Sequence, residues 1–250
     1  MKLFTVNQKG VKMMGKLYRD EVIKIAIAEL GYCEKASDYD LDSKTGNAGN
    51  GNYTKYARDL WNAQPHFYQG PKQGYEWCCV FYDSCIYEAC GRDSSYAQAA
   101  KYYTGPYGAG CAMAAMYYKE AGAWYVTPKA GDQIFFGNNN SYQHTGLVEK
   151  VENGKVYTIE GNSHNKVERR CYDITDSYII GYGRPKYDGD KRPSECPFVD
   201  VPSDAWYHDA VIWAYENGLT AGTDSTHFSP NAPFTRAMAV QMLYKFSQTQ

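Results

Sequence analysis

The spacing of apolar residues changes along the chain and predicts two kinds of secondary structure. In the first half, apolar positions recur at helical spacing, which predicts helices near residues 19–30, 53–62, 76–90 and 111–121. From Asp132 to Tyr182, short segments of alternating pattern are separated by turn residues, which predicts an antiparallel sheet. Helices followed by an antiparallel sheet indicate a domain of the α+β class.

The C-terminal part of the chain has a helical pattern of its own. One apolar run ends at Asn217 and Gly218, and a second run follows Thr235, a residue type that often caps helices. The two runs predict an αα-hairpin of about 50 residues, which is near the lower size limit for an independent core.

A charged stretch with glycine and proline joins the two patterns and is typical of a linker. We therefore expect a disordered N-terminal tail (1–15), a larger domain (16–187), a linker (188–196) and a small C-terminal domain (197–250). A chain of 250 residues is long enough for this arrangement.

Cys78 is the first candidate for chemistry because it falls at the start of a predicted helix. A loop composition precedes it, from Gly70 to Tyr75, so its side chain should lie in the first helical turn. Unpaired backbone N–H groups and the helix dipole favour an anion there, which would lower the pKa of the thiol and stabilise an oxyanion. The alternative is an unreactive, buried cysteine.

His144, Glu160 and Asn162 lie on the two arms of a predicted hairpin. A two-residue turn at Asn153 and Gly154 would place the histidine and the glutamate on opposite faces, because side chains alternate along a strand. A three-residue loop, with the glycine in a bulge, would place all three side chains on one face. We expect the three-residue loop, because a cysteine, a histidine and an orienting carboxylate or amide can then meet.

Four motifs follow one another in the order found in a known family. They are Trp77–Cys78, Gly131–Phe136, His144–Glu149 and Val156–Asn162. They resemble the CHAP family of cysteine- and histidine-dependent amidases and peptidases, which have a papain-like fold and act on peptidoglycan. The resemblance covers about residues 16–187. It implies that Cys78 is the nucleophile, His144 the general base and acid, and Glu160 and Asn162 the residues that orient the imidazole.

A second set of motifs follows the linker. They are Phe198–Val201, Asp204–Tyr207, Trp213–Ala214, Phe228–Pro230 and Thr235–Ala237. They resemble one S-layer homology repeat, a helical module that binds the secondary polysaccharide of bacterial cell walls. The resemblance implies Asp204, Trp206 and Arg236 as binding residues, with a core tryptophan and a helix-capping arginine as the alternatives. The family usually has three tandem repeats, whereas this chain has one.

Charge and hydropathy exclude several other classes. The net charge is −2 with both signs interspersed, which argues against nucleic acid as a partner. No segment approaches the roughly 20 apolar residues of a membrane span, and residues 1–15 lack the apolar core of a secretion signal. We therefore expect synthesis in the cytoplasm without a signal peptide and action at the bacterial cell wall.

The eight cysteines show neither metal-binding spacing nor a disulfide framework, so we expect free thiols. Cys79 departs from the CHAP pattern and is a second candidate nucleophile. Asp38, Asp40 and Asp42 resemble the start of a calcium loop, but Ser43 occupies the position of the usual glycine. We expect no cofactor, with calcium at this loop as the alternative.

These observations predict a cysteine hydrolase of peptidoglycan, either an N-acetylmuramoyl-L-alanine amidase or an endopeptidase, of the kind that phages and prophages produce as endolysins. Two alternatives remain open. One is a wall-binding protein with an inactive hydrolase domain, and the other is an NlpC-type endopeptidase or a toxin with a related fold.

Overall fold

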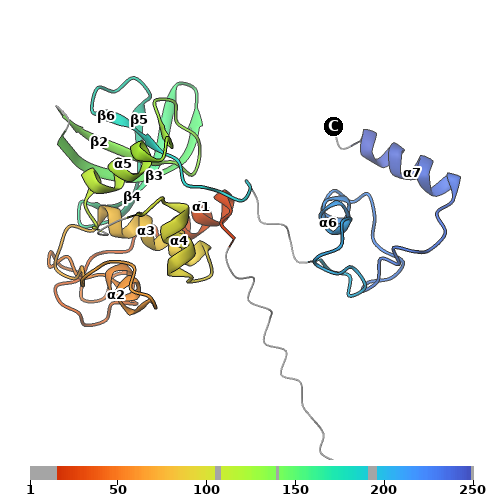
Figure 1. Ribbon diagram of the computed structural model, residues 1–250, viewed down its shortest axis with the longest axis horizontal. Coiled ribbons are helices and arrows are strands. Elements are labelled where there is room, and N and C mark those ends of the chain that lie inside the picture. Colours follow the sequence, from red (N-terminus) through yellow and green to blue (C-terminus); the bar gives the residue numbers. More distant parts are fainter. Residues whose placement is uncertain (1–15, 105–107, 139–140, 191–195, 249–250) are drawn as a thin grey trace, which may run out of the picture. The chain divides into compact units, whose positions relative to one another are not determined.

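The computed structural model describes residues 16–104, 108–138, 141–190 and 196–248. The chain divides into two compact units, Met1–Arg192 and Pro193–Gln250, whose elements are labelled in Figure 1. The predicted tail (1–15) and much of the predicted linker (191–195) lie outside the described residues.

The N-terminal unit is an α+β domain, as the sequence predicts. Its helices are α1 (Arg19–Ala28), α2 (Lys55–Asn62), α3 (Cys78–Ala89), α4 (Ser94–Ala100) and α5 (Cys111–Glu120). Its strands are β1 (Trp124–Tyr125), β2 (Gln133–Asn138), β3 (Ser141–Glu152), β4 (Lys155–Ser163), β5 (Lys166–Asp173) and β6 (Ile179–Gly183). They form one antiparallel sheet in the order β1-β6-β2-β3-β4-β5. The sequence did not predict α4 or β1.

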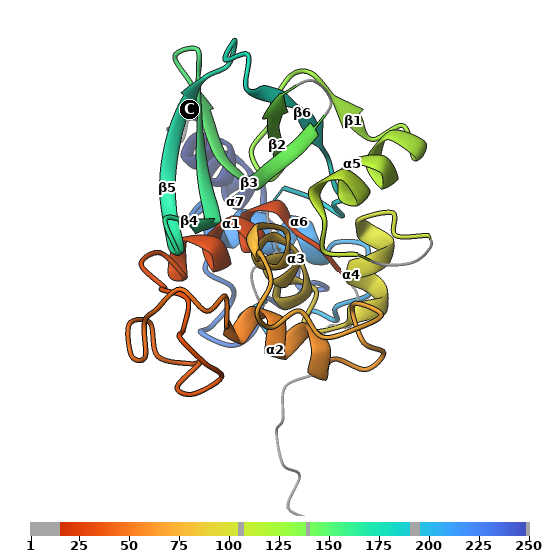
Figure 2. The same ribbon diagram turned by 90° about the vertical axis from the view of Figure 1, so that its left-hand side faces the viewer.

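Helix α3 is the centre of this unit. Every one of its residues except Glu88 is buried, because α1 and α2 pack on it and it also contacts β3 and β4 (Figure 2). Gly161 makes the contact with β4 possible. A Cβ atom at this position would lie 2.4 Å from Cβ of Phe81 and 2.8 Å from the ring of Trp77. The glycine therefore lets the start of α3 approach the strand that carries Glu160.

The register of the β3–β4 hairpin corrects the predicted turn. Glu152 pairs with Lys155, so the turn has two residues, Asn153 and Gly154. Both have positive φ angles, 52° and 72°, as a type I′ turn requires. The extra residue is Glu149, which forms a bulge farther along β3.

The bulge at Glu149 shifts β3 by one residue relative to β4, as the predicted three-residue loop would have done. Leu147 pairs with Ile159, which places residue 146 opposite residue 160. The prediction about the turn was wrong, whereas the predicted placement of residue 146 opposite residue 160 is present. The reason is that the one-residue shift comes from a bulge within the strand and not from the turn.

The C-terminal unit contains α6 (His208–Glu216) and α7 (Arg236–Ser247). Thr235 caps α7, as predicted, by accepting a hydrogen bond from the backbone nitrogen of Met238 at 3.2 Å. The small core consists of Phe198, Val201 and Val211. Helix α7 buries none of its residues. The two helices still touch, since the rings of Trp213 in α6 and Phe246 in α7 lie 5.9 Å apart, but most apolar side chains of α7 are exposed.

The described helices of this protein are short. Within the described ranges, none is both long enough and apolar enough to cross a bilayer.

Candidate active site

Cys78 is the first residue of α3, where the sequence predicts a reactive thiol. The preceding residue, Trp77, is fully buried and occupies the N-cap position. Its indole nitrogen donates a hydrogen bond of 2.7 Å to a carboxylate oxygen of Glu34, itself buried. No side chain caps the helix at Trp77, so the first backbone N–H groups of α3 are not occupied by a capping residue. The tryptophan thus fixes the position of the thiol and leaves these donors available.

His144 and Glu160 lie on the same face of the sheet and are in contact. The Nε2 atom of His144 is 2.9 Å from Oε2 of Glu160. The side chain of Glu160 is 1% exposed, whereas that of His144 is 21% exposed. The imidazole also stacks on Phe136, with ring centroids 5.9 Å apart. Because Nε2 faces the carboxylate, Nδ1 is the ring nitrogen that remains for the thiol.

The electrostatics of the site favour a thiolate beside an imidazolium. Hydrogen bonds from the thiols of Cys111 and Cys79 and from His144 lower the pKa of Cys78 well below its usual value, although burial opposes this. Burial of the imidazole lowers its pKa, but hydrogen bonds to Cys78 and Glu160 outweigh it and raise the pKa of His144 to about 10. Both shifts favour the charged forms, a thiolate at Cys78 and an imidazolium at His144.

Sequence reasoning missed two residues that hold Glu160 in place. The hydroxyl of Thr158 donates to Oε1 of Glu160 at 2.5 Å, and the Tyr172 hydroxyl lies 3.4 Å from Oε2. A buried carboxylate is costly without such donors. Thr158 is two residues before Glu160 on β4 and so shares its face, which was the available signal. Tyr172 comes from β5, whose register the sequence did not predict.

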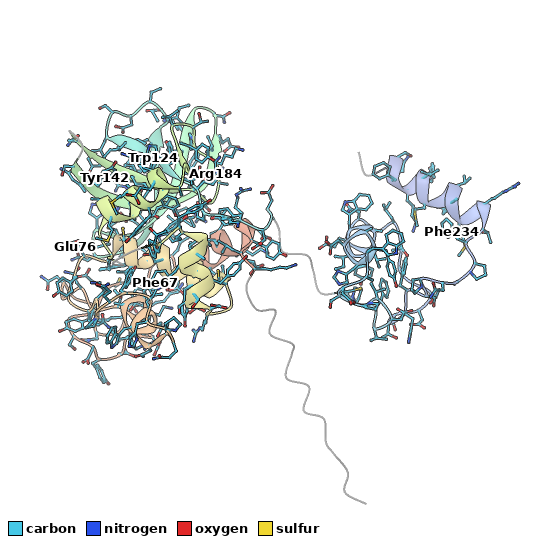
Figure 3. All side chains as sticks on the ribbon, in the orientation of Figure 1. Phe67, Glu76, Trp124, Tyr142, Arg184 and Phe234 are labelled. Atoms are coloured by element: carbon cyan, nitrogen blue, oxygen red, sulfur yellow. The ribbon has the colours of Figure 1, made fainter. Side chains whose placement is uncertain are left out.

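The structure does not bring Asn162 to His144, contrary to the expectation from the hairpin. Among the described residues, the Asn162 side-chain nitrogen donates to the carboxylate of Glu76, which is labelled in Figure 3 and precedes α3. The pairing of β4 with β5 shifts by one residue between Glu160 and Ser163, and Asn162 has a φ angle of 57°. This second bulge breaks the alternation that would have kept Asn162 and Glu160 on one face.

Cys79 has different surroundings from Cys78. Its sulfur donates to the Cys111 sulfur at 3.6 Å and lies 3.9 Å from the side-chain nitrogen of Gln133. Contact with Cys111, contact with Cys78 and burial all raise the pKa of Cys79 well above its usual value. Of the two candidate thiols, Cys78 is therefore the one whose environment favours a thiolate.

Gly146 faces Glu160, and this glycine supplies a prediction. A Cβ atom at position 146 would lie 2.5 Å from Cγ of Glu160 and 3.3 Å from the backbone oxygen of Ile159. Gly146→Ala should displace the carboxylate, lower the stability by about 1–3 kcal/mol and reduce turnover. Gly70→Ala is the matched control, because a Cβ atom there meets open space. Urea unfolding and turnover on purified walls measure both effects, and two alanine variants of equal stability and activity would contradict the packing argument.

The three residues expected to bind wall polysaccharide are all exposed. Asp204 and Trp206 precede α6, and Arg236 is the first residue of α7. Trp206 is 93% exposed, so the alternative of a core tryptophan does not hold. Within the described part of the chain, no hydrogen bond or ion pair joins Arg236 to Asp204. The structure therefore places them on the surface without assembling them into one site.

The acidic loop at Asp38, Asp40 and Asp42 has a partner for one of its carboxylates. Arg58 donates two hydrogen bonds to Asp42, of 2.8 Å and 2.7 Å. The arginine lowers the pKa of Asp42 and supplies the positive charge that a cation would otherwise bring. Calcium binding at this loop stays a prediction.

Comparison with known proteins identifies two domain classes. A model of the CHAP domain matches residues 70–162, a range that includes Cys78, His144, Glu160 and Asn162. A model of the S-layer homology domain matches residues 197–239. The chain thus contains a CHAP domain followed by an S-layer homology domain, which confirms both resemblances.

Two individual proteins resemble parts of the chain. The Surface-layer 125 kDa protein of Lysinibacillus sphaericus is 46% identical over 46 residues, which are 18% of this chain and 4% of that protein. A structure described as Ly7917 with the hydrolyzing product of MDP has a TM-score of 0.38 and 17% identity, over 67% of this chain and 62% of that one. The chain therefore spans less than two thirds of either protein.

Proposed function

We propose that this protein hydrolyses an amide bond of peptidoglycan through Cys78, assisted by His144 and Glu160. The observation that carries the proposal is the contact of His144 with Glu160 on the sheet face beside the start of α3, where the pKa of Cys78 is lowered. Glu160 binds Nε2 at 2.9 Å, and hydrogen bonding to the Cys78 thiol raises the pKa of the same ring. This is the arrangement of a cysteine nucleophile, its base and the residue that orients the base.

The reaction proceeds in two stages. The Cys78 thiolate attacks the amide carbon, and a carbon–sulfur bond forms while the carbonyl oxygen becomes an oxyanion. The uncapped backbone N–H groups at the start of α3 stabilise this oxyanion. The His144 imidazolium then protonates the amine as the carbon–nitrogen bond breaks, which leaves a thioester. In the second stage His144 removes a proton from water, and the hydroxide releases the acyl group and regenerates the thiolate.

Analysis of the products tests the proposal. Digestion of purified peptidoglycan by the full chain should release new amino groups and no new reducing sugar ends, with fragment masses that increase by one water for each bond cut. Mass spectrometry then distinguishes the muramoyl-L-alanine amide from a peptide bond in the stem or the cross-bridge. Release of reducing ends, or no change in intact walls, would contradict the proposed reaction. The endolysin role stays a prediction.

We also propose that the C-terminal unit binds a secondary polysaccharide of the wall, with Trp206 as a sugar-facing residue. Support comes from its 93% exposure, which leaves the indole ring free to pack on a ligand, and from the enrichment of tryptophan at interfaces. Trp206→Ala should weaken co-sedimentation of the full chain with polysaccharide-bearing walls by about 10-fold, or roughly 1.4 kcal/mol.

Matched variants separate binding from catalysis. Tyr39→Ala removes an aromatic side chain that is 75% exposed in the N-terminal unit and should leave co-sedimentation unchanged. Deletion of Pro193–Gln250 should abolish binding to intact walls while soluble wall fragments are still hydrolysed. If the truncated and the full chain bind walls equally, the C-terminal unit has no anchoring role.

A further inference from the structure

Three buried thiols from two helices meet beside the proposed nucleophile. The Cys111 sulfur is 3.7 Å from that of Cys78 and 3.6 Å from that of Cys79. All three sulfurs lie within 4.8 Å of one another. Within the described residues, this is the only group of three or more histidine, cysteine or acidic side chains whose donor atoms are close enough to hold one metal ion.

The backbone around the cluster favours negative charge on the sulfurs. Cys78 is the first residue of α3 and Cys111 is the first residue of α5. Neither helix has a side-chain cap at its N-cap residue. Two helix N-termini, each carrying partial positive charge, therefore meet at the cluster. Metal ions bind thiolates and not thiols, so a metal would join the favoured thiolate of Cys78 and displace the protons that Cys79 and Cys111 still hold.

The sulfur–sulfur distances distinguish a metal site from a disulfide. In a tetrahedral zinc site with Zn–S bonds of about 2.3 Å, neighbouring sulfurs are about 3.8 Å apart. The two contacts with Cys111, at 3.7 Å and 3.6 Å, already have this spacing. A disulfide has a sulfur–sulfur bond of about 2.05 Å, so either pair would have to close by about 1.6 Å. Contact between thiols has the same spacing, so a metal ion could bind with little movement of these two pairs, whereas a disulfide would require one pair to close.

Gln133 provides a second, independent observation at the cluster. Its side chain is fully buried, and its amide nitrogen lies 3.9 Å from the sulfur of Cys79. Its amide oxygen is buried and has no hydrogen-bond partner among the described residues. An acceptor without a donor is costly in a protein interior. The nitrogen of the same amide faces Cys79 as a donor, which helps to hold negative charge on that sulfur.

We propose that Cys78, Cys79 and Cys111 form a three-thiolate site for a single thiophilic divalent cation, with Zn²⁺ as the natural probe. Binding forms three metal–sulfur bonds and releases to solvent the protons that the thiols still carry. The site itself does not depend on the proposed function. The effect of the metal on activity does rest on the proposed function. The sulfur of Cys78 donates its lone pair to the metal and cannot attack a carbonyl. The metal-bound enzyme is therefore inactive until a chelator removes the ion.

Metal binding by the full-length, reduced protein tests the proposal directly. After treatment with a chelator, titration with Co²⁺ should give a sulfur-to-cobalt charge-transfer band that saturates at one ion per chain, and Zn²⁺ should displace it. Cys111→Ser should lower the affinity by more than about 100-fold, since loss of even outer-shell partners costs about 10- to 100-fold. Cys171→Ser, which changes an exposed cysteine, should bind like the unchanged protein.

Several results would overturn the site. These are saturation without a charge-transfer band, equal affinity of Cys111→Ser and the unchanged chain, or loss of binding in Cys171→Ser. A metal-free disulfide between Cys78 and Cys111 after exposure to Zn²⁺ and air would show a redox pair instead. If Cys111→Ser does not fold, Cys79→Ser is the variant whose Co²⁺ affinity tests the site, and an unchanged affinity would overturn it. If the protein binds Co²⁺ but does not hydrolyse walls, the metal site is supported and the proposed function is wrong. If it hydrolyses walls but does not bind Co²⁺, the proposed function is supported and the metal site is wrong.

Discussion

Replacement of Cys78 by alanine is expected to abolish hydrolysis of purified peptidoglycan, with a loss of about 10³-fold or more. The reason is that the variant removes the sulfur whose pKa its surroundings lower well below its usual value, whereas the pKa values of Cys79, Cys85 and Cys111 are raised. The fold should be unaffected, because the side chain is small and lies at the start of α3. Release of amino groups over time measures the loss.

Two further variants make this result specific. Cys171→Ala removes an exposed cysteine and should retain full turnover. Cys79→Ala leaves Cys78 with His144 and so should retain the nucleophile. Activity that persists in Cys78→Ala and disappears in Cys79→Ala would assign the reaction to the neighbouring thiol.

Glu160→Gln is expected to lower turnover by roughly 10²-fold and to change the pH profile. The ion pair exists above the pKa of Cys78 and below that of His144, which is about 10. Loss of the carboxylate removes a negative charge that favours the imidazolium, so the pKa of His144 falls. The alkaline limb of the profile should therefore move to lower pH, by about 1–3 units, the usual effect of one nearby opposite charge.

The pH shift separates a positioning role from simple damage to the fold. Glu149→Gln is the matched control, because Glu149 pairs with Arg169 away from the imidazole, at 2.8 Å. It should leave both turnover and the alkaline limb unchanged. A Glu160→Gln protein with an unaltered alkaline limb would show that the carboxylate does not act through His144.

The class of the fold and the helices could be read from the sequence because local patterns encode them. The helices at 78–89 and 111–120 follow from apolar spacing and from loop residues before them. The strand β1 has two residues, which is too short for an alternating pattern. Helix α4 is capped by Asp93, which accepts from the Tyr96 backbone nitrogen at 3.0 Å. The sequence therefore contains a capping signal for α4, but this signal is a single polar residue.

The site was harder to predict because it depends on two irregularities. A bulge at Glu149 brings His144 and Glu160 to one face, and a second bulge after Glu160 turns Asn162 away to Glu76. Neither bulge has a marker in the alternation of side chains. Cys111 is distant from Cys78 in sequence, so only the packing of α5 beside α3 could reveal the thiol cluster.

Trp124 and Tyr142, labelled in Figure 3, close the apolar layer around that cluster. Their rings are 6.2 Å apart, and both pack against the group that contains the three cysteines and Phe135. This layer excludes water from the sulfurs, which strengthens the charge interactions of the thiolate.

The Glu149 bulge has a consequence for how the hairpin tolerates changes in length. Residues 150–152 and residues 147–148 each pair regularly with β4, and Glu149 alone has no partner there. A chain lacking this one residue would retain every pair on both sides, so His144 and Glu160 would still face each other. Loss of a residue between 145 and 148 would instead invert the orientation of His144. Homologous hairpins are therefore free to differ by one residue at a single point, and evolution can shorten this strand there without dismantling the reaction centre.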